Sequence, residues 1–100
     1  MANQFGDRLK QLREQKKLLQ RQIASSLEID TPMLSKIERG ERKAKKKHVI
    51  QLASILNADK EELLILWLAD QVAEVVKDED YALKAMQVAE EGVKYKKYKK

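Results

Sequence analysis

An all-α fold is predicted for this chain of 100 residues, and three observations support that class. Helix formers such as Leu, Ala, Lys, Gln and Glu dominate the composition, whereas strand formers are scarce. Helix breakers are few, with one Pro and three Gly. Apolar residues recur every three to four positions, which is the period of an amphipathic helix. A chain of this length forms one domain, or one small domain with an extension.

The first helix is expected from about Phe5 to Gln15, because Phe5, Leu9 and Leu12 recur at i, i+4 and i+7. Four more helices are expected over about residues 20–27, 31–39, 49–56 and 60–76, and a sixth from near residue 80. Asp59 supplies an acidic N-cap for the fifth helix. The sixth helix has an apolar seam at 4-3-4 spacing, formed by Ala82, Met86, Ala89 and Val93.

Residues 20–40, QRQIASSLEIDTPMLSKIERG, predict two short amphipathic helices with a sharp joint between them. Ala24 is small where the two helix axes must approach closely, and Asp30 with Pro32 marks the start of the second helix. Gly40 supplies the stop that helix C-termini favour. This is the pattern of a helix-turn-helix motif, whose second helix enters the major groove of DNA.

The charge of +5 is unevenly distributed along the chain. Residues 1–59 carry 13 basic and 7 acidic side chains, whereas residues 60–93 carry 3 basic and 9 acidic ones. The first part is therefore suited to a polyanion. Residues 41–47, ERKAKKK, are expected to form a basic connection and not a packed element. The basic tail at residues 94–100 is expected to be disordered and solvated, with non-specific binding to nucleic acid as the alternative.

The composition and the lack of certain motifs argue against several classes of function. The chain has no Cys, so thiolate metal sites and disulfides are excluded, as fits a reducing cytoplasm. No export signal opens the chain, and the longest apolar run, 63–69, is too short to cross a bilayer. His48, the only His, is expected at the surface or at a helix start. Without a catalytic motif, metal site or cofactor site, no enzyme activity is expected, and the location is predicted to be cytoplasmic, on the nucleoid.

At this point the spacing resembles the Cro and lambda-repressor type of helix-turn-helix regulators, the xenobiotic-response-element family. The segments that carry the resemblance are Gln20, Ile23-Ala24, residues 34–40 (LSKIERG), residues 49–56 and residues 59–63 (DKEEL). The resemblance implies a five-helix, lambda-repressor-like DNA-binding domain over residues 1–66. Residues 67–100 would be a C-terminal helical extension for dimerisation, ending in the basic tail.

The same resemblance implies roles for individual residues. Base contacts would come from Thr31, Pro32, Met33, Ser35 and Lys36, with core packing as an equal alternative for Met33. Phosphate contacts would come from Gln20, Arg39, Arg42, Lys43 and Lys45. Arg13 and Glu38 would form a partly buried bidentate ion pair that positions the second helix. Glu28 departs from the family pattern, which has Gly at this turn; either the turn differs or it tolerates a strained positive φ.

The expected fifth helix is apolar all round at residues 63–68, LLILWL, so one face needs a partner beyond the core. A symmetric dimer contact is expected from Ile65, Trp67, Leu68, Val72, Val75 and Val76. The alternative is burial of this face by the sixth helix of the same chain.

Together these features predict a sequence-specific DNA-binding regulator, a repressor that binds a palindromic operator in double-stranded DNA as a homodimer. One alternative is the antitoxin of a toxin–antitoxin pair, which would bind a protein partner through its C-terminal helices and autoregulate its operon. Another is a protein that binds membrane surfaces through residues 63–68 and the Lys tail.

Overall fold

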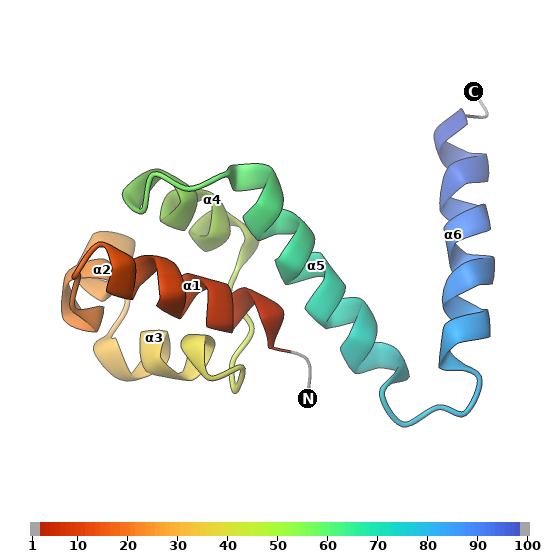
Figure 1. The fold of residues 1–100 in the computed structure, drawn as a ribbon, viewed down its shortest axis with the longest axis horizontal. Helices are drawn as coiled ribbons and strands as arrows, with labels where there is room; N and C mark the ends of the chain where they lie inside the picture. Colours follow the sequence, from red (N-terminus) through yellow and green to blue (C-terminus); the bar gives the residue numbers. More distant parts are fainter. Residues whose placement is uncertain (1–2, 99–100) are drawn as a thin grey trace.

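The computed structural model describes residues 3–98, and within that range the chain is all-helical. The helices are α1 (Gln4–Gln15), α2 (Gln20–Leu27), α3 (Thr31–Glu38), α4 (Lys46–Ile55), α5 (Lys60–Val76) and α6 (Ala82–Tyr98). In Figure 1, α1 to α5 are gathered into one body and α6 stands apart from it. No helix in the described range is both long and apolar enough to cross a membrane.

The core lies between the first five helices. α1 packs on α3 and α5, α2 packs on α3 and α4, and α4 packs on α5. Each of these short helices contributes apolar side chains at helical spacing, as the sequence pattern predicts. The buried apolar residues are Phe5, Leu9, Leu12, Ile23, Ala24, Leu27, Leu34, Ile37, Ala44, Val49, Leu52, Ala53, Leu56 and Leu63. Residues of α2 and α3 therefore share one core.

Three expectations about the helices and the segments between or after them need correction. α4 begins at Lys46, three residues before the first apolar position used to predict it, because a first turn of lysines has no apolar signal. Ala44 is buried, so the basic connection at residues 41–47 does include a packed residue. The tail was expected to be disordered, but residues 94–98 belong to α6; residues 99–100 lie outside the described residues.

α1 is fastened to α5 by a cap that comes from 66 residues away. The two carboxylate oxygens of Asp70 accept hydrogen bonds from the backbone N–H groups of Gln4 (3.0 Å) and Phe5 (2.9 Å). These N–H groups have no partner within the helix, and a negative charge is favourable there. Asp70 and Trp67 both lie beyond residue 66 yet contact the first part of the chain, so the expected domain boundary falls inside an element of the core.

α1 also approaches the end of α3 so closely that only glycine fits at one position. A Cβ on Gly6 would lie 2.5 Å from the carbonyl oxygen of Glu38 and 2.8 Å from that of Ile37. Asn3 closes the same junction, since its side-chain amide donates to the Glu38 carbonyl at 2.9 Å. The C-terminal end of α3 is therefore held directly against the start of α1.

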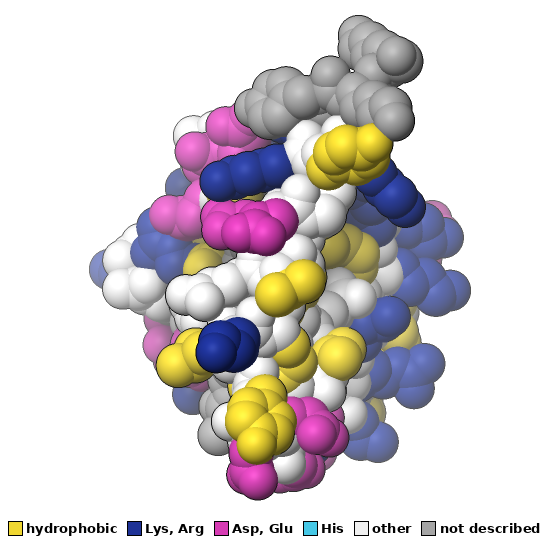
Figure 2. Space-filling model, turned by 90° about the vertical axis from the view of Figure 1, so that its right-hand side faces the viewer, with side chains coloured by type: hydrophobic (Ala, Val, Ile, Leu, Met, Phe, Trp, Pro, Cys, Tyr) yellow, Lys and Arg dark blue, Asp and Glu magenta, His cyan; other side chains and the backbone are white. Residues whose placement is uncertain are grey.

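α6 lies outside the core that the first five helices form. It makes no extensive contact with any other helix, and no side chain in it is buried among those described. Figure 2, which looks onto the side of the molecule that carries α6, shows separate apolar side chains at the surface. The alternative in which the sixth helix buries the apolar face of α5 is therefore not what the structure has.

Candidate nucleic-acid interface

The joint between α2 and α3 is a left-handed turn closed by backbone and side-chain hydrogen bonds. Glu28 has φ 59° and ψ 40°, so the strained alternative predicted for this position is the one the chain adopts. The N–H of Ile29 donates to the carbonyl of Ala24 at 3.0 Å, which satisfies the end of α2. Asp30 then caps α3 by accepting from the Met33 N–H at 2.7 Å. The joint therefore leaves little freedom between the two helices.

α3 has one face in the core and one face in solvent. Leu34 and Ile37 are buried, whereas the side chains of Pro32 and Lys36 are exposed. Thr31 and Ser35 are half-buried at the edge of the solvent-facing side. Met33 packs partly against the core, which favours the packing role over a base contact for this residue.

A buried ion pair holds the end of α3 against α1. Arg13 donates from Nε to Oε2 of Glu38 at 2.7 Å and from Nη2 to Oε1 at 3.1 Å. The side chains of Arg13 and Glu38 are only 12% and 2% exposed. The hydrogen bond to Glu38 raises the pKa of Arg13 against the opposing effect of burial. Arg13 also donates to the carbonyl of Leu18 at 3.0 Å and so ties the loop before α2 to the same group.

Gln20 belongs to this network, which the sequence did not indicate. Its side-chain amide donates to Oε1 of Glu38 at 2.9 Å, so α2 is connected to α1 and α3 through one carboxylate. An amide NH₂ has two N–H groups, and the second one is not used in this bond. The side chain was expected to bind a phosphate; the structure gives it a positioning contact within the protein.

Basic side chains continue from the end of α3 to the start of α4. The exposed members are Arg39, Arg42, Lys43, Lys45, Lys46 and Lys47. Arg39 forms an ion pair with Glu41 at 2.7 Å and also donates to the hydroxyl of Ser35. The hydrogen bond between Arg39 and Glu41 raises the pKa of Arg39 and lowers the pKa of Glu41. Because both groups of the pair are exposed, water competes with it, and Arg39 can exchange Glu41 for another anion at small cost.

The basic segment is anchored at its centre. The buried Ala44 presents its carbonyl oxygen to the indole N–H of Trp67 on α5, at 2.8 Å. This bond and the packing of Trp67 on the core direct its indole into its own domain, while the expected contact of Trp67 with a second subunit stays a prediction. The cations on either side of Ala44 are thereby held beside α3.

His48 follows the lysines and lies in the first turn of α4, where a helix-start position was expected. Its side chain is nevertheless buried, and its Nδ1 has no hydrogen-bond partner among the described residues, so the surface position is wrong. Burial, with Lys47 and Lys45 nearby, lowers the pKa of His48. The neutral imidazole is therefore the form that the fold favours.

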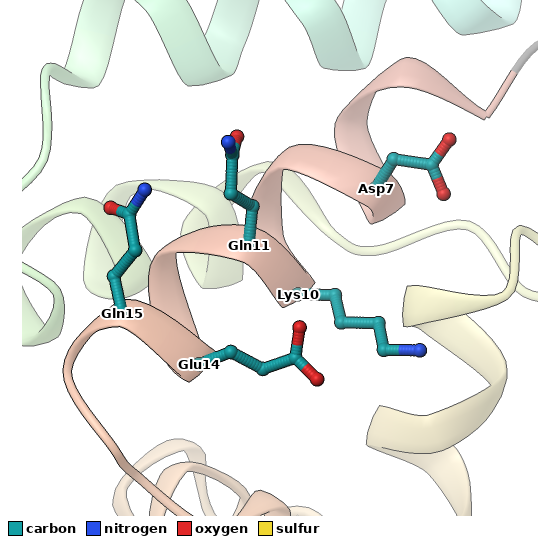
Figure 3. A pocket seen from close by; sticks show the side chains of 5 residues that line it. All are labelled: Asp7, Lys10, Gln11, Glu14 and Gln15. Carbon is teal, nitrogen blue, oxygen red and sulfur yellow. The ribbon is translucent and has the colours of Figure 1, made fainter.

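One shallow depression lies on the solvent-facing side of α1. Figure 3 shows this depression, whose five labelled side chains all come from the outer face of α1 and point in different directions. They are Asp7, Lys10, Gln11, Glu14 and Gln15. Within residues 3–98, no group of His, Asp and Glu side chains is arranged to hold a metal ion.

A further surface feature is an apolar stripe along α5. Ile65 is 64% exposed, Leu68 53%, Val72 49% and Val75 79%, whereas Val76 is half-buried. Solvent-exposed apolar side chains occur singly on many proteins, but four in helical register on one helix indicate a contact surface. This stripe, defined by the four exposed residues, lies outside the packed core.

Comparison with known families agrees with this geometry. A family model described as a helix-turn-helix domain matches residues 4–64, from the first turn of α1 into α5. No curated protein and no solved structure gave a significant match.

Proposed function

From the premise that the chain belongs to the helix-turn-helix domain family of DNA-binding regulators, we propose that it is a repressor that binds a palindromic operator as a homodimer. Occupation of the operator would block the polymerase, which requires no catalysis and no cofactor. Such a protein would act on the nucleoid.

The observation that carries this proposal is the placement of α3. Its exposed side presents Lys36 with Thr31 and Ser35 nearby, while its other side is buried and its end is fixed by the pair of Arg13 and Glu38. A rigidly held helix with donors on its free face suits the major groove, which is about 12 Å wide. The basic segment follows it directly, where the phosphate backbone would lie.

The residues divide into two roles under this proposal. Lys36 would donate to guanine O6 or N7, with Thr31 and Ser35 at base edges and Pro32 against a thymine methyl group. Affinity without sequence choice would come from phosphate contacts by Arg39, Arg42, Lys43 and Lys45, together with the N-terminal end of α2 at Gln20.

Selection of bound sequences from a random DNA pool tests sequence recognition. We expect one preferred half-site, repeated with two-fold symmetry about 34 Å apart, as two recognition helices on one face of DNA require. A pool that shows no enrichment would contradict sequence-specific binding, and a single half-site without symmetry would contradict the homodimer.

Two lysines separate the roles. Replacing Lys36 with Ala should change the preferred sequence and cost about 1–3 kcal/mol on the original site. Replacing Lys45 with Ala should weaken binding to all sequences alike and reduce the salt dependence, log Kd against log salt, by about 0.9. Fluorescence anisotropy over a range of salt measures both, and the opposite pattern would refute the assignment.

The homodimer is proposed from the exposed stripe on α5. Sedimentation equilibrium of the full chain should give twice the monomer mass. A monomer that purifies with a stoichiometric second protein would instead favour the antitoxin alternative, in which this surface binds another chain.

A further inference from the structure

α6 has a largely exposed surface in its own chain. It makes no extensive contact with the other helices, and Leu83, Val88 and Val93 are each more than 60% exposed. A single helix of 17 residues is only marginally stable in water, so most helices of this length depend on packing. The helix therefore needs a surface to pack against.

We propose that α6 pairs antiparallel with α6 of a second copy, with the two-fold axis between Gln87 and Val88. The inference rests on the proposed homodimer and adds a second contact between its two copies. Two features of the sequence of α6, its apolar spacing and its charge order, favour a second copy over an unrelated partner.

The first feature is the spacing of the seam. Ala82, Met86, Ala89 and Val93 follow one another at steps of four, three and four, which read the same in both directions. In an antiparallel pair about the proposed axis, Ala82 faces Val93 of the other copy and Met86 faces Ala89. Each layer then combines one small and one larger side chain, which allows the helices to approach closely. A second copy therefore supplies a complementary seam, in which each Ala faces a larger side chain.

The second feature is the order of charges. The connection before α6 is acidic at Asp78, Glu79 and Asp80, and the end of α6 is basic at Lys94, Lys96 and Lys97. An antiparallel pair brings the acidic start of each copy to the basic end of the other, whereas a parallel pair would bring like charges together at both ends. The charges therefore favour the antiparallel orientation.

The pairing is also consistent with the stripe on α5. α5 and α6 of one chain are joined by a short connection, residues 77–81, yet neither covers the other. The pairing through α6 therefore does not compete with the stripe on α5 for the same side chains.

Cysteine cross-linking tests the pairing, because the natural chain has no Cys. An equimolar mixture of the full-length variants Ala82→Cys and Val93→Cys should form a disulfide-linked dimer under mild oxidation. Each variant alone should not, because its two Cys residues would lie about 16 Å apart along the axis, at 1.5 Å per residue. The matched control is a mixture of Lys84→Cys and Glu91→Cys, which lie at corresponding heights on the opposite face and should not cross-link.

The outcomes distinguish this inference from the proposed function. Cross-linking of Ala82→Cys with itself would overturn the antiparallel orientation, and a dimer without the 82–93 cross-link would overturn the α6 pairing alone. A monomer in sedimentation would overturn both the pairing and the homodimer, while binding to a single half-site would remain measurable.

A charge in the seam gives a second test. Ala89→Arg should raise the dimer Kd at least tenfold, whereas Gln87→Arg, outside the seam, should change it less than twofold. Melting of the core should be unchanged in both variants, because α6 lies outside it. An undiminished dimer in Ala89→Arg would refute the inference.

Discussion

The ion pair between Arg13 and Glu38 can be removed from one side, and its burial determines the expected cost. Arg13→Met deletes two of the three donors that reach the Glu38 carboxylate, at 2.7 and 3.1 Å, and leaves only Gln20 at 2.9 Å. With Glu38 only 2% exposed, the remaining charge is buried and poorly compensated. Such a loss costs about 3–5 kcal/mol, compared with about 0–1 kcal/mol for a surface pair.

Urea and thermal unfolding followed by circular dichroism measure this cost. For a domain of this size, about 3 kcal/mol corresponds to a fall in Tm of roughly 12 °C or more. The matched control is Arg8→Met, which breaks the more exposed pair of Arg8 with Glu62 and should cost at most about 1 kcal/mol. The double variant Arg13→Met/Glu38→Leu removes both charges and should recover part of the lost stability.

A cost below about 1 kcal/mol for Arg13→Met would refute the reasoning, because the pair would then behave as a solvent-exposed one. Equal costs for Arg13→Met and the Arg8→Met control would do the same, since burial is the difference between the two sites.

Three further predictions concern stability. Glu28→Gly should raise the unfolding free energy by about 1 kcal/mol, because φ is positive at this turn; a lower urea midpoint would contradict that geometry. Asp70→Ala should lower the unfolding free energy by about 1–2 kcal/mol, because α1 loses its cap. The control Glu74→Ala, one turn later, should have little effect, and equal losses in the two variants would argue against the cap. Burial lowers the pKa of His48 in the folded chain, so the unfolded chain binds the proton more tightly. The contribution of the neutral imidazole to the free energy of unfolding is therefore complete above about pH 6.5 and is lost as pH falls below that value. His48→Gln should flatten this dependence in urea titrations between pH 5 and 8, and an unchanged slope would show that other groups cause it.

Much of the helical framework was predictable because its signals are local. α2 and α5 have the predicted bounds, and the caps at Asp30 and Asp59 accept the backbone N–H groups that their positions indicated. Gly40 has φ 78°, as a helix stop requires. Each of these features depends on residues within one or two turns of each other, which a sequence pattern records directly.

The candidate site was predictable only in part. Lys36 and the basic segment follow from the motif, since exposed positions of an amphipathic helix can be read from its spacing. The engagement of Gln20 by Glu38 and the buried position of His48 could not be read in this way, because both depend on which elements meet in space. The nearest signal was the polar character of Gln20, which suits a partner in the protein as well as a phosphate.

The fold class, the helix-turn-helix motif and the basic residues that follow it could therefore be inferred from the sequence, because periodicity, caps and charge are properties of short segments. The arrangement of the helices in space was needed to find that Asp70 caps α1 from 66 residues away and that the indole of Trp67 donates to the carbonyl of Ala44. The same arrangement shows that α6 leaves the stripe on α5 uncovered. These contacts join segments that are far apart in the sequence. Many different arrangements of the helices would satisfy the same local sequence patterns, so the patterns alone do not say which helices meet.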